Sequence, residues 1–351
     1  MSNSKLTLII DGNWLLMSRL SVINDKYESE DDLFNALQKM LLRSIEITIK
    51  HFKDIDNIIF VADGGSWRNK VELPKCLESE GIEYKGNRIK SDDINWDKVF
   101  YKYEELINIL KSTNINVCKE SGIEGDDWCY YWSNKLNSEN TNCIIWSKDR
   151  DLTQLVKINS DFCFTTCWDK KSGFVLPEYN YDDFNFLFNA KYNENYQIFN
   201  NIITNDKNNK INYIKPNAIV VEKILKGDAV DNIQPVFVRN SKSNSEKKFK
   251  ISTKDIDTSL NVYDDNEVLK FFENVLNSKS YLNRVDKNID DIIEHFKYNR
   301  TLISLNEKSY PKNILDIMNS KNIEKINKNI SEALNIVISK SNKLSNILEF
   351  I

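Results

Sequence analysis

The chain has 351 residues, 41% hydrophobic and 11% aromatic, and a formal net charge of -4 from 48 Lys and Arg against 52 Asp and Glu. This length and aromatic content support a large buried core, which excludes an intrinsically disordered protein. No apolar run approaches the roughly 18 residues of a membrane span, and Asp11 interrupts the first apolar run too early for a signal peptide. We therefore expect a soluble cytoplasmic protein with no membrane contact. The slight acidic excess argues, at first, against a nucleic-acid partner.

Six cysteines are spread between positions 76 and 167, without the paired CxxC spacing of a zinc site. Cys163 and Cys167 form a lone CxxxC, and the chain contains only two histidines. We therefore interpret these two cysteines as buried thiols.

Short apolar runs rich in Ile and Val alternate with longer segments of helical periodicity through the first two thirds of the chain. Helices of this length between strands imply right-handed crossovers and a parallel sheet. The predicted fold class is α/β, with a central, mostly parallel sheet and helices on both faces. In chain order we expect a strand over 5–12, a helix over 31–52, a strand over 57–64, a polar stretch over 64–95, a helix over 96–112, a strand over 115–119, a helix from Glu124, a strand over 143–147 and a short helix from Asp151.

The last part of the chain follows a different pattern. Residues 180–213 are crowded with Asn, Tyr and Asp, and the run NDKNNK within them indicates an exposed loop. A helix is expected over 216–226, and the stretch 239–254 holds six basic residues and one Glu. The amphipathic segments that follow, up to Ile351, predict an all-helical C-terminal region.

Acidic residues gather where the predicted strands end. Asp11 and Asp63 end the first two strands, and Asp149 and Asp151 directly follow the fourth. Each alone is explained by the preference of Asp for turns and helix N-termini. Parallel strands end at one edge of the sheet, however, and so many carboxylates repel one another unless cations neutralise them. Oxygen ligands without His or Cys suit Mg²⁺ or Mn²⁺ better than a soft metal. Calcium is disfavoured, because the sequence contains no contiguous loop of the EF-hand kind. Between the third strand and the next helix lie Glu124, Asp126 and Asp127.

A further acidic motif follows the helix predicted at 216–226. ILKGDAVDNI contains Asp228 and Asp231, and Gly227 permits a tight turn before them. GD and DN are common turn dipeptides, so the motif is weak evidence alone. Combined with the other carboxylates, it would complete a second metal position. Two hard cations close together favour in-line hydrolysis of a phosphodiester.

Taken in order, IIDGNWLL, FVADGG, GIEGDDW, SKDRDLTQL and ILKGDAVDNI resemble the successive motifs of the 5′-nuclease superfamily, which includes flap endonucleases and the exonuclease domain of bacterial DNA polymerase I. GSWRNK, YKGNR, VFVR and SNILEF are most similar to the RNase H of T-even bacteriophages. The resemblance covers roughly the whole chain. It implies an α/β metal-dependent nuclease core over 1–180, with an arch or bridge over about 64–95. It also implies a helical region over 181–351 that carries the GDxxDN motif and binds DNA.

The resemblance also implies roles for individual residues. The first metal would be held by Asp11, Asp63, Asp126 and Asp149, with Glu124 nearby. The second would be held, largely through water, by Asp151, Asp228 and Asp231; Asp127 is counted with the metal site and its role is left open. Lys85 and Arg88 match basic residues that reach the scissile phosphate, and are counted as catalytic with the first four carboxylates. Further nucleic-acid contacts are expected from Arg68, Arg239, Lys242, Lys247, Lys248 and Lys250. Without the resemblance, Arg68, Lys85 and Arg88 would be interpreted as solvated surface charges.

The expected function is that of an Mg²⁺-dependent 5′→3′ exonuclease and flap endonuclease with RNase H activity, which removes RNA primers and 5′ flaps during DNA replication. Two Mg²⁺ ions, replaceable by Mn²⁺, and 5′-phosphate products are implied. The expected substrates are branched or flapped DNA and RNA–DNA hybrids. The expected partners are a single-strand-binding protein and a sliding clamp, for a monomeric, phage-encoded protein in the bacterial cytoplasm.

Two alternatives stay open. A PIN-type endoribonuclease shares the sheet and a smaller acidic set, but the GDxxDN motif and the chain length count against it. A non-catalytic branched-DNA-binding protein would have lost ligands, and no expected carboxylate is missing. The acidic balance of the whole chain does not exclude DNA as a partner. Without the nine carboxylates of the predicted site, the rest of the chain carries a net positive charge.

Overall fold

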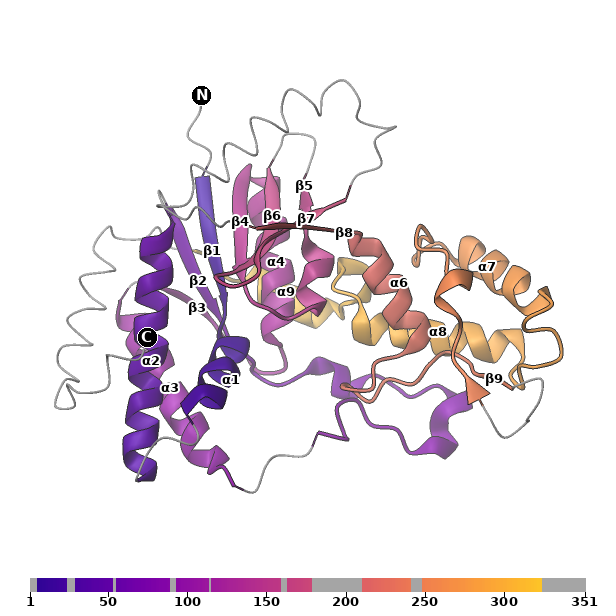
Figure 1. The fold of residues 1–351 in the computed structure, drawn as a ribbon, viewed down its shortest axis with the longest axis horizontal. Coiled ribbons are helices and arrows are strands. Elements are labelled where there is room, and N and C mark those ends of the chain that lie inside the picture. The colour runs from indigo at the N-terminus through magenta and orange to yellow at the C-terminus, as the bar shows by residue number, and fades with distance from the viewer. Residues whose placement is uncertain are drawn as a thin grey trace. The chain divides into compact units, whose positions relative to one another are not determined.

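The computed structural model describes residues 5–23, 29–52, 55–88, 93–113, 115–158, 163–178, 210–240 and 248–323. The chain forms two compact units (Figure 1). Unit 1 comprises residues 1–65, 90–214 and 318–351, and unit 2 comprises residues 66–89 and 215–317. The division differs from the one expected from sequence, because residues 66–89 group with the C-terminal helices instead of the N-terminal core.

Unit 1 is built on an eight-stranded sheet in the order β3-β2-β1-β4-β6-β7-β8, with β5 paired to β6. The pairs among β3, β2, β1, β4 and β6 are parallel, as is β7 with β8, whereas β6 pairs antiparallel with β5 and β7. The predicted mostly parallel sheet is therefore confirmed. The strands are β1 (Lys5–Asp11), β2 (Asn57–Val61), β3 (Asn116–Cys118), β4 (Thr141–Trp146), β5 (Lys157–Ile158), β6 (Phe164–Asp169), β7 (Gly173–Pro177) and β8 (Ile211–Ile214).

Strand register brings the acidic strand ends together. β1 lies between β2 and β4, with Ile10 opposite both Phe60 and Trp146. The segments that follow these three strands therefore leave the sheet at the same edge, where the predicted carboxylates lie. Among the strand residues, Leu8 and Ile10 pack with α2 and α3 in one buried core. Alternation along the strands sends the residues between them to the opposite face.

Helices cover both faces of this sheet, with α2 and α3 on one side and α4 on the other (Figure 1). The predicted helices at 31–52, 96–112 and from Glu124 are confirmed, each with a capping side chain at its start. Residues 12–23, to which the sequence pattern assigned no element, also form a helix. The bounds are α1 (Gly12–Ile23), α2 (Glu30–His51), α3 (Trp96–Ser112), α4 (Gly125–Ser138) and the short 3₁₀ helix η3 (Asp151–Leu155).

Unit 2 is mainly helical and has its own apolar core, in which Val221, Phe237, Phe272 and Phe296 are almost fully buried. Its elements are η1 (Trp67–Lys70), η2 (Lys75–Glu80), α6 (Pro216–Lys226), β9 (Arg239–Asn240), β10 (Lys248–Phe249), η4 (Thr253–Asp255), α7 (Asp265–Asn277), α8 (Ile289–Ile303) and η5 (Glu307–Ser309), and α9 (Lys312–Asn319) spans the boundary to unit 1.

The helices expected in the C-terminal region are present, and short strands that were not expected accompany them. β8 extends the main sheet beside β7, and β9 pairs antiparallel with β10. Backbone pairing to a neighbouring strand decides these short elements, and their sequences carry no strong alternation. The expected loop over 180–213 falls largely outside the described residues, as do residues 324–351 of the expected helical region.

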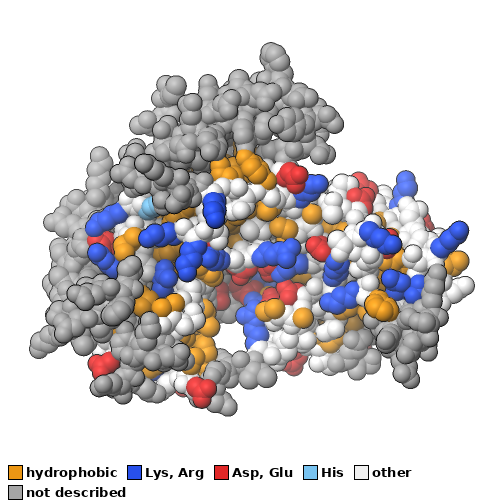
Figure 2. Space-filling view, in the orientation of Figure 1, with side chains coloured by type: hydrophobic (Ala, Val, Ile, Leu, Met, Phe, Trp, Pro, Cys, Tyr) orange, Lys and Arg blue, Asp and Glu red, His pale blue; other side chains and the backbone are white. Residues whose placement is uncertain are grey.

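Two features noted in the sequence can be compared with the described residues. None of the helices described is long and apolar enough to cross a membrane. Cys163 and Cys167 are buried free thiols, as predicted. On the face drawn in Figure 2, Lys and Arg side chains are spread widely and form no single patch.

Candidate functional site

Asp11 ends β1 and is 4% exposed. Its Oδ1 accepts the Trp14 N–H at 3.0 Å, and its Oδ2 accepts the Ser147 hydroxyl at 2.8 Å. Burial raises the pKa of Asp11 to about 7, assisted by the charges of Asp149 and Asp63 and opposed by those two hydrogen bonds. A buried carboxyl beside other carboxylates is costly to ionise without a cation.

Asp63 follows β2 and is held at both oxygens. Its Oδ2 accepts from Asn13 Nδ2 at 2.5 Å, and its Oδ1 accepts the Gly125 N–H at the start of α4 at 2.7 Å. The next residue, Gly64, has no room for a side chain, because a Cβ there would lie 1.8 Å from the Glu120 carbonyl oxygen. The backbone after Asp63 therefore packs closely against the loop that leads into α4, with which Gly64 exchanges backbone hydrogen bonds.

Three acidic residues open α4. Asp127 is fully buried, and its Oδ2 accepts the Glu124 N–H at 3.1 Å in a capping box. This contact gives Asp127 a helix-capping role that accounts for an acid there without a metal. Asp126 faces the other carboxylates: burial raises its pKa well above the usual range, and the charges of Asp149, Asp11, Asp63 and Glu124 add to the effect.

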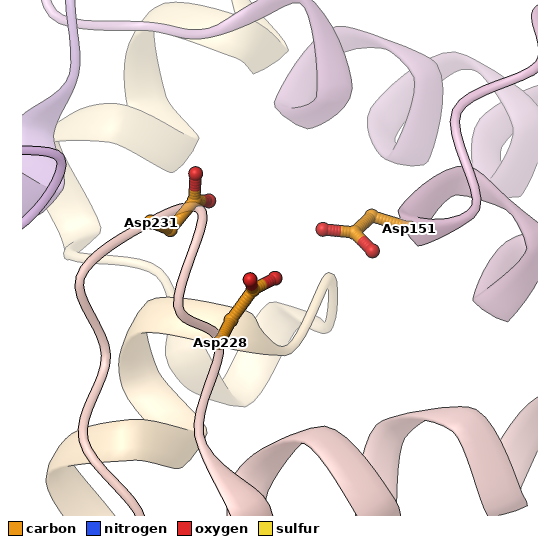
Figure 3. A group of neighbouring side chains, drawn as sticks. All are labelled: Asp151, Asp228 and Asp231. Atoms are coloured by element: carbon orange, nitrogen blue, oxygen red, sulfur yellow. The ribbon is translucent and has the colours of Figure 1, made fainter. Parts of the chain in front are cut away.

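The segment after β4 supplies two more carboxylates. Ser147, the residue that donates to Asp11, accepts the Asp149 N–H at 2.9 Å. Asp149 Oδ1 in turn accepts the N–H of Asp151 at 2.8 Å. Asp151 begins η3 and is half-buried (Figure 3).

Unit 1 therefore brings Asp11, Asp63, Asp126 and Asp149 into mutual electrostatic contact, with Glu124 beside Asp126. Each repulsive contact raises the free energy of the ionised set, and a divalent cation removes that repulsion. The donors are all carboxylate oxygens, which fits a hard cation such as Mg²⁺ or Mn²⁺ and not a thiolate-bound metal.

The GDxxDN motif forms a tight turn after α6 in unit 2. Gly227 has a φ of 69°, and a Cβ there would lie 2.2 Å from the Ile233 carbonyl oxygen. Asp228 and Asp231 both project from this turn (Figure 3). Lys223 Nζ lies 2.6 Å from Asp228 Oδ2; this ion pair outweighs the effect of burial and lowers the pKa of Asp228.

Lys85 and Arg88, predicted to reach the scissile phosphate, lie in a turn that packs on this motif within unit 2. Lys85 adopts a left-handed backbone with a φ of 58°, and its N–H donates to the Asp231 carbonyl oxygen at 2.9 Å. The Arg88 guanidinium forms an ion pair with the Asp231 carboxylate. Neither the pairing nor the unusual backbone was foreseen from sequence.

Two amide side chains that sequence reasoning missed lock these turns together. Asn87 Nδ2 donates to the Ala229 carbonyl oxygen at 2.7 Å, and Asn232 Nδ2 donates to the Glu83 carbonyl oxygen at 2.9 Å. Asn232 itself has a φ of 57°. Asn is among the residues that tolerate this conformation best, which was the available signal.

The predicted phosphate contact of Arg68 is not supported. Arg68 is 3% exposed, its Nε donates to the Leu302 carbonyl oxygen at 2.9 Å, and its guanidinium lies 4.6 Å from the Trp67 ring centre. Tyr310 borders it on another side at 6.0 Å. A guanidinium enclosed in this way stabilises unit 2 and does not present its charge to solvent.

The basic stretch 239–254 is partly described. Arg239 is half-buried and stacks over Tyr281 and Phe249 at 5.1 and 5.7 Å, whereas Lys250 is exposed. The predictions for Lys242 and Lys247 lie outside the described residues, and Lys248 lies in β10. Lys250 is therefore a basic residue of this stretch that is exposed to solvent.

Comparisons with known proteins agree with this architecture. The family model of the 5′-3′ exonuclease N-terminal resolvase-like domain matches residues 6–184. A 5′-3′ exonuclease of Mycoplasmopsis pulmonis is 31% identical over 160 residues, which are 45% of this chain and 48% of that protein. One of Buchnera aphidicola is 25% identical over 231 residues, 65% of each protein. The matched chain thus spans about half to two thirds of these relatives' length.

Among solved structures, the T5 D15 protein co-crystallised with metal ions matches with a TM-score of 0.50 at 16% identity, covering 96% of this chain and 99% of that one. At this identity the match establishes the fold alone. The family match covers just over half of the sequence, including the strands and helix starts that carry the carboxylates of unit 1. The chain therefore belongs to the 5′-3′ exonuclease family defined by the N-terminal resolvase-like domain.

Proposed function

We propose that the protein is a divalent-metal-dependent 5′ nuclease that hydrolyses phosphodiester bonds near the 5′ ends of DNA and RNA–DNA hybrids. The observation that carries the proposal is the convergence of Asp11, Asp63, Asp126 and Asp149; burial, assisted by the repulsion among these carboxylates, raises the pKa of both Asp11 and Asp126. Perturbed carboxyl groups of this kind are concentrated at functional sites. Membership of the 5′-3′ exonuclease family supports the reaction class.

Each residue of the site has a proposed role in metal or phosphate binding. Asp11, Asp63, Asp126 and Asp149 bind one cation, with Glu124 beside it, and Asp151, Asp228 and Asp231 bind a second through water. Asp127 keeps its capping contact. When bound, Mg²⁺ or Mn²⁺ supplies a water of lowered pKa and stabilises the attacking and leaving oxygens. Lys85 and Arg88 hold the scissile phosphate, where their positive charge offsets the charge that develops during cleavage.

The finer substrate preference follows from the resemblance of the motifs. We expect cleavage of 5′ flaps and removal of RNA primers, with 5′-phosphate products. A single-strand-binding protein and a sliding clamp are the partners proposed, and the protein is proposed to act as a monomer in the bacterial cytoplasm. Exposed lysines such as Lys250 are proposed to contact backbone phosphates, which supply most of the affinity for nucleic acid.

The decisive experiment measures cleavage of an end-labelled 5′-flap substrate with Mg²⁺ and with EDTA. We expect cleavage only with Mg²⁺ and a 5′-phosphate on the product. Asp126→Asn and Asp149→Asn should abolish cleavage while DNA affinity stays within about threefold, since phosphate contacts dominate binding. Asp257→Asn is the control, because Asp257 is an exposed acid of unit 2 whose carboxylate accepts the N–H and the hydroxyl of Ser259 in its own turn.

The two alternatives predict other outcomes. Preferential cleavage of a structured single-stranded RNA would support a PIN-type endoribonuclease. Flap binding without metal-dependent cleavage of any substrate would support a non-catalytic DNA-binding protein. Full activity in both Asp126→Asn and Asp149→Asn would refute the assignment of the site.

A further inference from the structure

The side chain of Asn13 contacts Asp63 in two ways. Asn13 Nδ2 donates to Asp63 Oδ2 at 2.5 Å, and Asn13 Oδ1 accepts the Asp63 N–H at 3.1 Å. Asn13 lies in the first turn of α1, directly after β1, and Asp63 follows the neighbouring parallel strand β2. One amide group therefore ties together the two strand ends that carry Asp11 and Asp63.

The orientation of this amide is itself fixed. The Tyr103 hydroxyl on α3 donates to Asn13 Oδ1 at 3.2 Å, and Tyr103 is 4% exposed. A Cβ at Gly12 would lie 2.4 Å from the Tyr103 hydroxyl oxygen, so a glycine there makes room for the phenol. With two donors on its oxygen, the Asn13 amide must turn its NH₂ group toward the Asp63 carboxylate.

The Asp63 carboxylate is hydrogen-bonded at both of its oxygens. Oδ2 accepts from Asn13, and Oδ1 accepts the Gly125 N–H at 2.7 Å. Held at both oxygens, the carboxylate loses little further rotational freedom when a cation binds, and hydrogen-bonded ligands of this kind bind metal more tightly.

We propose that Asn13 is a positioning residue that orients the Asp63 carboxylate for cation binding, and that Tyr103 acts through Asn13. This inference rests on the proposed role of Asp63 as a cation ligand. It adds two uncharged side chains, those of Asn13 and Tyr103, to the site. Tyr103 lies on α3, a helix that contributes no carboxylate to the site.

The test is Mn²⁺ binding to the nucleic-acid-free protein, measured by electron paramagnetic resonance, together with kcat and KM on a flap substrate. Asn13→Ala should weaken Mn²⁺ binding about tenfold, and Tyr103→Phe should weaken it by a smaller factor, as expected for partners of a ligand. The loss should appear in kcat at low metal concentration, with KM for DNA unchanged, and high metal should restore it. Tyr101→Phe removes an exposed hydroxyl from the same helix and should behave as wild type.

The double variant Asn13→Ala/Tyr103→Phe tests the order of action. If Tyr103 acts through Asn13, the double variant binds Mn²⁺ as Asn13→Ala does, whereas multiplied losses would overturn the role of Tyr103. Mn²⁺ affinity of Asn13→Ala within twofold of wild type, while Asp63→Asn loses binding, would overturn the role of Asn13 and leave the proposed function intact. Unchanged Mn²⁺ binding in Asp63→Asn would instead refute Asp63 as a ligand. Thermal melting of each variant separates these results from loss of the fold.

Discussion

Arg88 and Asp231 form an ion pair within unit 2, although 143 residues separate them in the sequence. The Arg88 side chain is 53% exposed and that of Asp231 15%. Asp228 is likewise paired, with Lys223. The carboxylates of the GDxxDN motif therefore have cationic partners of their own, whereas Asp11 and Asp126 repel acidic neighbours. A cation must compete with these partners, so the second proposed metal position should be the weaker one.

Replacing Arg88 should therefore affect metal binding and cleavage in opposite directions. In Arg88→Gln we expect Mn²⁺ to bind up to about fivefold more tightly at the weaker of the two metal positions. The cation then no longer competes with the Arg88–Asp231 ion pair, and an exposed ion pair is worth about this factor. Cleavage should nevertheless slow by about tenfold or more, because the phosphate loses a cationic contact. Mn²⁺ titration and single-turnover cleavage measure the two effects. Lys226→Gln is the control, since Lys226 pairs with Glu222 on its own helix. Parallel losses of metal binding and cleavage would contradict this account.

A divalent cation should raise the melting temperature more at about pH 8 than at about pH 6. Burial raises the pKa of Asp11 to about 7 from the ordinary 3.8. Between these values the folded protein holds more protons than the unfolded chain, so the metal-free protein loses stability as the pH rises through this range. Above it, a cation binds without displacing the proton of Asp11. Calorimetry with Mg²⁺ and with EDTA at both pH values measures the difference, and Asp149→Asn should reduce it. An equal rise at both pH values would contradict the prediction.

Replacing Arg68 distinguishes the phosphate contact predicted from sequence from the stabilising role that its burial indicates. Arg68→Met should lower the free energy of unfolding by about 2 kcal/mol, because the Leu302 carbonyl oxygen loses a charged donor and the aromatic rings lose a partner. Flap affinity below the melting transition should stay unchanged. Chemical denaturation and fluorescence anisotropy measure the two quantities. Lost affinity in a fully stable variant would restore the phosphate-contact interpretation.

Local patterns predicted much of unit 1. β1, β2 and β4 are short apolar runs, and α2, α3 and α4 repeat apolar residues at helical spacing, so these elements could be placed before any contact was known. α1 was missed because apolar residues occupy nearly all sides of Gly12–Ile23. β6 and β7 depend on their antiparallel pairing and on the turn at Gly173, where φ is 77°. Long-range pairing of this kind leaves little local signal.

The candidate site shows the same division. Acids at the ends of parallel strands converge because topology requires it, so Asp11, Asp63 and Asp149 could be grouped from sequence alone. The surroundings of a charge cannot be inferred in that way. Arg68 is enclosed partly by a carbonyl group 234 residues away. The Asn13 contact with Asp63 likewise requires knowing how two loops meet.

Unit 2 should lose stability in mild acid because of His295. His295 is fully buried, Lys287 Nζ lies 3.2 Å from its Nδ1, and burial together with this charge lowers its pKa to about 4 from the ordinary 6.5. The unfolded chain therefore takes up a proton between these values that the folded protein does not. Stability is complete above about pH 6.5 and falls toward about pH 4, by at most about 1.4 kcal/mol per pH unit.

Chemical denaturation of wild type and His295→Gln across this range tests the prediction. The variant should lose the part of the pH dependence that arises from His295, even if it is less stable at neutral pH. His51→Gln is the matched control: His51 is the other histidine of the chain, half-buried in unit 1, with its ring 5.1 Å from that of Trp168. A pH dependence that persists in His295→Gln and disappears in His51→Gln would assign the effect to unit 1 instead. That outcome would also mean that the buried ring of His295 is protonated as readily as an exposed one.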